Sequence, residues 1–104
     1  MHAEMDGQFE IVIYKLKASV NRDQFMEVSA RATEWLRGRP GYLGRELLED
    51  DSGQWVDLVR WTTIEDALSA ASAFIEVPEA AAFMDAVEPE SITMLHPRHV
   101  VLYE

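Results

Sequence analysis

Two histidines near the end of the chain are the first side chains that could do chemistry. His96 and His99 flank Arg98, and a histidine can transfer protons near neutral pH or ligate haem iron. On a regular strand, successive side chains alternate between faces, so His96 and His99 cannot both serve one site. His96 is therefore a candidate catalytic residue. The simpler interpretation is an exposed or interface histidine.

Tyr14 is the second candidate catalytic residue. Its hydroxyl could donate a hydrogen bond to a bound phenol, or its ring could lie in an interface between subunits. The interface is the simpler expectation for an aromatic ring within the apolar run 9–16.

Asp57 is unusual because it lies in a run whose alternate members are apolar. These members are Trp55, Val59 and Trp61. A carboxylate in such a place must find a partner or contact water. Arg45 and Lys15 are possible partners, and we expect a structural or interfacial role for Asp57.

Several classes of chemistry find no support in the sequence. The chain has no cysteine, which excludes disulfides, thiolate nucleophiles and cysteine-bound zinc. It contains no HxH or HExxH spacing, no phosphate-binding Walker A or GxGxxG loop, and no GxSxG nucleophile motif. We expect no metal site and no separate organic cofactor.

The charge balance argues against two kinds of partner. Nine Lys and Arg residues stand against nineteen Asp and Glu, so the acidic chain carries a formal net charge of −10. Nucleic acids and anionic membranes attract basic surfaces, so we expect neither as a partner. No apolar run approaches the ~20 residues of a membrane span. Residues 1–7 lack the basic and apolar regions of a signal peptide, so the expected location is cytoplasmic.

Hydrophobic periodicity predicts the strands that must position these side chains. Residues 9–16 are rich in β-branched and aromatic types. Residues 42–49 and 54–61 alternate apolar and polar side chains, and the turn residues 50–53 join them as a hairpin. A final strand segment is predicted over 91–103, interrupted at its proline.

Capping signals predict the helices between these strands. Asn21 suits an N-cap and Gly38 a C-terminal cap, with an apolar stripe at helical spacing between them. Thr63 caps a second helix, and Pro78 ends it and begins another. The order βαββαβ predicts an α+β, ferredoxin-like fold with helices on one face of a four-stranded antiparallel sheet. Residues 1–104 should form one domain, with 1–8 as a loose N-terminal segment.

Both faces of the predicted sheet are apolar. In the first strand, Phe9, Ile11 and Ile13 lie on one side, whereas Val12, Tyr14 and Leu16 lie on the other. An uncovered apolar face of this size would be large for a monomer. A second copy that packs sheet on sheet is the simplest cover, so the sequence predicts a homodimer through the helix-free face.

The central segment resembles the antibiotic biosynthesis monooxygenase family of dimeric α/β-barrel proteins. The resemblance lies in Pro40-Gly41-Tyr42-Leu43-Gly44, in Trp61 at a strand end, and in Glu65-Asp66-Ala67-Leu68 at a helix start. It extends more weakly over residues 9–103. It implies a pocket between sheet and helices, which in catalytic members holds a polycyclic phenol or haem. Those members oxidise the ligand with oxygen, without a separate organic cofactor or metal.

The resemblance also implies site residues. Trp61 matches the strand-end tryptophan that lines the family's pocket, and the other expected substrate-binding walls are Trp35, Phe74 and Phe83. The family's helical histidines are absent, since Ala70 or Ala71 stands at one position and Glu79 at the other. The first strand also lacks the asparagine of haem-degrading members, so we do not expect haem degradation. The simpler interpretation of both tryptophans is an ordinary core.

Two functions remain open from the sequence. The first is a cofactor-independent monooxygenase acting on a small aromatic or polycyclic substrate. The alternative is a non-catalytic dimeric module on the same fold, with a ligand-binding, regulatory or structural role. Proteins of this fold have many activities, so only the side chains of the site can distinguish the two functions.

Overall fold

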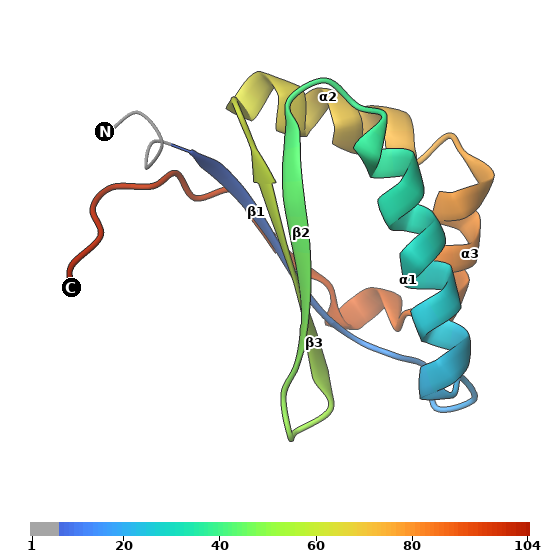
Figure 1. The fold of residues 1–104 in the computed structure, drawn as a ribbon. Coiled ribbons are helices and arrows are strands. Elements are labelled where there is room, and N and C mark those ends of the chain that lie inside the picture. The colour runs from blue at the N-terminus through green and yellow to red at the C-terminus, as the bar shows by residue number, and fades with distance from the viewer. Residues whose placement is uncertain (1–6) are drawn as a thin grey trace.

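Helices cover one side of a single sheet in the computed structural model, which describes residues 7–104 (Figure 1). The elements are, in order, β1 (Gln8–Lys15), α1 (Arg22–Arg37), β2 (Tyr42–Glu49), β3 (Gln54–Trp61), α2 (Ile64–Phe74), α3 (Pro78–Ala86), the short 3-10 helix η2 (Pro89–Ser91) and β4 (Thr93–Leu95). The strands form a four-stranded antiparallel sheet in the order β2-β3-β1-β4. The predicted α+β, ferredoxin-like fold is therefore confirmed.

The predicted helix boundaries follow from capping contacts that the structure contains. The Asn21 side chain accepts a hydrogen bond of 2.8 Å from the Gln24 backbone N–H, and the Gln24 side chain accepts one of 3.4 Å from the Asn21 backbone N–H. Thr63 caps α2 through one such bond, in which its side chain accepts from Asp66 N–H at 3.1 Å. Pro78 is the first residue of α3, where its missing N–H leaves no broken bond.

The prediction of a long final strand is wrong. β4 covers only Thr93–Leu95, and beyond it β1 makes one further bridge, between Gln8 and Arg98. Pro97 has no N–H to donate, although its carbonyl accepts from Phe9 N–H at 2.9 Å.

At the N-terminal end of the chain, β1 begins at Gln8, inside the segment predicted to be loose. The rest of that prediction, over 1–6, lies outside the described residues.

Apolar side chains lie on both faces of the sheet, as the sequence predicted. Toward the helices β3 presents Trp55, Asp57, Val59 and Trp61, all buried. On the other side, cross-strand pairs bring apolar side chains together: Ile11 with Leu58 and with Leu95, Ile13 with Val56, and Val56 with Leu48. No helix of the described chain covers this second side (Figure 1). We call it the open face.

A β-bulge interrupts the start of β2. Tyr42 pairs with Trp61, but the next paired residue is Gly44, opposite Arg60, so the register shifts by one residue. Both Tyr42 and Arg45 therefore face the helices, although three positions separate them. Tyr42 packs edge-on against Trp61, with ring centroids 5.8 Å apart.

The core consists of two clusters. One surrounds Phe25, which is fully buried against Tyr14, Trp55 and Val87. The other surrounds Trp61, also fully buried, with Val59, Ala67 and Ala70 as its buried neighbours. Residues of both clusters line the cavity described below.

No single helix in residues 7–104 has the length and apolar composition to cross a membrane. Helices α2 and α3 meet those criteria only when taken together, and they are bent by 84° at their junction. Both bury alanines against the rest of the fold, namely Ala67, Ala70, Ala80 and Ala86.

Two glycines with positive φ provide a matched test of this architecture. Gly41 (φ 80°) leads into β2, and a Cβ there would overlap the side chains of Thr62 and Asp66. Gly53 (φ 91°) lies at the β2–β3 turn, where a Cβ would meet nothing within 4 Å. We expect Gly53→Ala to cost about 1–2 kcal/mol of unfolding free energy, from backbone strain alone. Gly41→Ala should cost a further ~1–3 kcal/mol, because the added methyl also overpacks the site. Urea unfolding measures both, and equal losses would contradict this account of Gly41.

Candidate functional site

A cavity of about 300 Å³ lies between the helices and the helix-facing side of the sheet. Its walls are mainly apolar and come from all four strands and all three α-helices. The predicted wall residues Trp61, Phe74 and Phe83 all line it. Met84 and Met94 also line it and are each about half exposed, which places them where the cavity opens to solvent. Concave apolar spaces with a few polar groups are typical of small-molecule sites.

Trp35 does not line the cavity, so that prediction needs correction. Its α1 neighbours Ala32 and Leu36 point into the cavity, whereas Trp35 is turned away by the helical rotation. The ring centroids of Trp35 and Phe74 are 5.3 Å apart, and the Arg39 guanidinium carbon lies over the Trp35 ring, 4.7 Å from its centroid. Trp35 therefore packs against a residue of the cavity lining, Phe74, without lining the cavity itself.

A buried polar triad lies at the sheet side of the cavity. The Tyr14 hydroxyl donates to Asp57 Oδ2 at 2.7 Å, and Arg45 Nε donates to Asp57 Oδ1. Arg45 Nη1 also donates to the Ser29 carbonyl at 2.8 Å and to Thr33 Oγ1 at 2.7 Å. These bonds join β1, β2, β3 and α1. Of the two partners predicted for Asp57, Arg45 is confirmed, whereas Lys15 is exposed at the end of β1.

Electrostatics keep Tyr14 and Arg45 each in one protonation state. Burial, the negative charge of Asp57 and the hydrogen bond to it raise the pKa of Tyr14 far above its usual range. Burial alone would lower the pKa of Arg45, but the hydrogen bond and charge of Asp57 outweigh it and raise that pKa. Tyr14 thus stays neutral and Arg45 stays charged. The expectation that Tyr14 lies in a subunit interface is wrong, since it is 1% exposed on the helix side.

A second polar cluster surrounds Glu10, a residue that sequence analysis did not single out. Glu10 lines the cavity and is buried. Its Oε1 accepts from Trp61 Nε1 at 3.3 Å, and His96 Nε2 lies 3.3 Å from its Oε2. The candidate His96 thus contacts a residue of the cavity lining, Glu10, but does not itself line the cavity. Alternation along β1 could have revealed Glu10, because it shares a face with Val12 and Tyr14, as Asp57 does with its apolar neighbours.

His99, the other histidine considered above, lies apart from this cluster. Its backbone N–H donates to the Gly7 carbonyl at 3.0 Å. Within residues 7–104, no group of three or more His, Asp or Glu side chains is placed to hold a metal ion.

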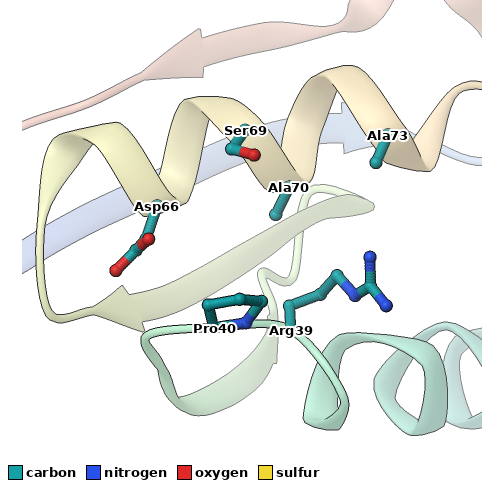
Figure 2. Close-up of a pocket in the computed structure, with 6 residues that line it drawn as sticks. All are labelled: Arg39, Pro40, Asp66, Ser69, Ala70 and Ala73. Carbon is teal, nitrogen blue, oxygen red and sulfur yellow. The ribbon is translucent and has the colours of Figure 1, made fainter.

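A second, much smaller pocket lies between the α1–β2 connection and α2 (Figure 2). Figure 2 shows Arg39 and Pro40 on one side and Asp66, Ser69, Ala70 and Ala73 on the helix opposite. Its volume of about 40 Å³ is too small for an organic ligand. Because a water molecule occupies roughly 30 Å³ of liquid, this pocket has room for about one water.

Comparison with solved structures shows where this fold occurs. SnoaB, a cofactor-independent oxygenase from Streptomyces nogalater, matches with a TM-score of 0.69 at 18% identity, over 95% of this chain and 96% of that one. A Bordetella bronchiseptica protein, provisionally described as an antibiotic biosynthesis monooxygenase, matches with a TM-score of 0.73 at 16% identity, over 91% and 99%. A hydroxynitrile lyase from Passiflora edulis matches with a TM-score of 0.68 at 16% identity, over 95% and 98%.

These matches show that the chain has an antibiotic biosynthesis monooxygenase-like fold, as the sequence resemblance implied. The same fold carries both oxygenase and lyase activity among the matched proteins. No model of a protein family and no curated protein sequence matches the chain. Similarity of fold alone therefore does not identify the chemistry of this chain.

The triad makes a quantitative prediction about stability. Arg45→Met should leave the buried Asp57 carboxylate without its counter-charge and cost about 3–5 kcal/mol of unfolding free energy. The double variant Arg45→Met/Asp57→Leu removes both charges. The Tyr14 hydroxyl then loses its acceptor, at a cost of about 1–3 kcal/mol, and the loss of the Arg45 bonds to Ser29 and Thr33 is common to both variants. Urea unfolding of the two variants tests this. A double variant that is less stable than the single one would contradict the assigned ion pair.

Proposed function

We propose that this protein oxidises a small aromatic compound with molecular oxygen, using no organic cofactor and no metal. The observation that carries the proposal is the apolar cavity with a carboxylate, Glu10, in its lining. A cavity of ~150 Å³ can hold benzene. The cavity here, at about 300 Å³, therefore suits a fused-ring compound whose outer edge extends through the opening beside Met84 and Met94.

The chemistry requires the substrate itself to supply the electrons. An aromatic hydroxyl compound, or a ketone in equilibrium with one, becomes electron-rich when it loses a proton. Oxygen then takes electrons from this anion, one oxygen atom enters the ring system and the other leaves as water. Trp61, Phe74 and Phe83 would stack against the rings and keep bulk water away. The fold shared with the oxygenase SnoaB supports this proposal.

Anthrone is a suitable probe, because loss of a C10 proton converts this three-ring ketone into an aromatic anion. Conversion of anthrone and oxygen into anthraquinone and water balances without another reductant. We expect the protein to accelerate oxygen uptake by anthrone in the presence of a metal chelator, with one anthraquinone formed per oxygen consumed. An oxygen electrode and absorption spectroscopy measure the two quantities.

Two variants on α2 make the test specific to the cavity. Ala71→Phe adds a ring inside the cavity, whereas Leu68→Phe adds the same ring at a half-exposed position outside its lining. The affinity for anthraquinone, measured by quenching of tryptophan fluorescence, should weaken at least ~10-fold in Ala71→Phe, because the added ring takes up space that the ligand needs, and remain unchanged in Leu68→Phe. A tenfold change corresponds to about 1.4 kcal/mol of binding free energy. Binding without oxygen uptake would favour the alternative, a non-catalytic ligand-binding module. Absence of both would leave a structural role.

We also propose that the protein is a homodimer in which the open faces of two copies pack together. The pairs of apolar residues on that face, such as Ile11 with Leu58 and Ile13 with Val56, would otherwise contact water. A cytoplasmic location is part of the same proposal, because the acidic composition suits a protein dissolved in the cell interior.

Sedimentation equilibrium at micromolar concentration should therefore give about twice the chain mass of 11.9 kDa. Leu58→Lys places a charge at the centre of the open face and should shift the protein to the monomer mass, because the interface would have to bury that charge. Leu68→Lys, on the surface of α2, is the matched control and should remain dimeric. A wild-type monomer would rule out this assembly.

A further inference from the structure

We propose that Glu10 and His96 form a proton relay, in which Glu10 accepts a proton from the ligand in the cavity and His96 passes it to solvent. The inference rests on the proposed function and deepens it, because it assigns the residues that take the proton from the substrate. The substrate would carry an acidic O–H, or a C–H beside a carbonyl group, on an aromatic ring system.

Glu10 is distinguished from Asp57 by its partners. Asp57 is bonded by the Arg45 guanidinium and by the Tyr14 hydroxyl, so its charge is compensated and both of its oxygens are engaged. Glu10 makes no salt bridge with Lys or Arg in residues 7–104; its contacts are the Trp61 indole and the His96 imidazole. Of the two carboxylates that line the cavity, only Glu10 therefore remains available to take a proton from a ligand.

Trp61 fixes the direction of the Glu10 carboxylate. Its Nε1–H donates to Oε1, and its ring is completely buried, so the indole cannot turn away. A carboxylate offers about four acceptor positions, and these contacts leave others open toward the cavity. The aromatic residue that walls the cavity thus also holds the proton acceptor at its edge.

His96 connects this buried carboxylate to water. The His96 side chain is 23% exposed to solvent, whereas the Glu10 side chain is 10% exposed. His96 Nε2 lies beside Glu10 Oε2. A carboxylate can only accept, so the resting imidazole carries its hydrogen on Nε2. Once Glu10 is protonated, the imidazole changes tautomer through water, accepts the proton at Nε2 and releases the hydrogen on Nδ1 to solvent.

The chemical step is balanced without an oxidant. The ligand's O–H or C–H bond breaks, its electron pair stays on the ligand and spreads over the rings, and the proton bonds to Glu10. With anthrone, this step exchanges the hydrogens at C10 for deuterium when the solvent is D2O. Exchange can be followed by NMR under strictly anaerobic conditions, so the relay is measured separately from oxidation.

We expect the wild type to accelerate anaerobic C10 exchange over the protein-free solution. Glu10→Gln should lower this acceleration at least ~100-fold, the scale of general-base catalysis, while anthraquinone binding changes less than about threefold. Glu34→Gln, the same change on the exposed side of α1, should leave exchange unaltered. If Glu10→Gln does not fold, Glu10→Asp keeps the charge but shortens the side chain and should still lower exchange ~10-fold.

His96→Gln tests the second half of the relay. It should slow exchange at least ~10-fold, and added imidazole should restore much of the rate, because a mobile base can replace one at a partly exposed position. Unchanged exchange in His96→Gln would exclude His96 from the relay.

The remaining outcomes separate the relay from the oxygenase. Anaerobic exchange that depends on Glu10, without oxygen uptake in air, would support the relay and overturn the oxygenase. Oxygen uptake with normal exchange in Glu10→Gln would overturn the relay and support the oxygenase. Absence of both exchange and anthraquinone binding in the wild type would overturn both.

Discussion

The ion pair between Arg45 and Asp57 is the interaction on which the rest of the site depends. Removing two charges from water costs several kcal/mol per ion, so a buried pair persists only where further hydrogen bonds satisfy it. Here the Tyr14 hydroxyl donates a further hydrogen bond to Asp57, and Ser29 and Thr33 accept further hydrogen bonds from Arg45. Three strands and the first helix thus share one polar anchor beneath a largely apolar cavity. An apolar substitute for this anchor could stabilise the fold equally well, but it would not fix the spacing of helix and sheet by directional bonds.

The anchor also explains how one cavity can hold two carboxylates with different roles. Asp57 is held by an arginine whose charge is permanent, so its own charge is part of the structure. Glu10 lies beside an indole and an imidazole, one a fixed donor and the other a group that can exchange protons. Enzymes commonly assign separate tasks to two acids in this way, by giving them different surroundings. The fold common to an oxygenase and a hydroxynitrile lyase sets no such roles, which arise from the side chains of each chain.

Sequence reasoning was successful where a local rule determines the outcome. The caps at Asn21 and Thr63 and the break at Pro78 are local, and the structure contains all three. It was less successful where the partner lies far along the chain. Tyr14 was expected at an interface because both faces of β1 are apolar, so alternation alone did not reveal which face the helices cover. Glu10 escaped notice because its partners, Trp61 and His96, are 51 and 86 residues away.

The bulge at the start of β2 has a consequence for how this segment tolerates changes in length. Side chains along a strand alternate between its two faces, and the bulge shifts this alternation by one residue between Tyr42 and Gly44. Without the bulge, simple alternation would put Tyr42 and Arg45, which are three positions apart, on opposite faces, and one of the two would point out of the molecule. One choice would uncover Trp61, and the other would take the guanidinium away from Asp57. The bulge thus accommodates one extra residue, the half-exposed Leu43, and deletion of Leu43 should leave both the aromatic contact and the ionic contact in place.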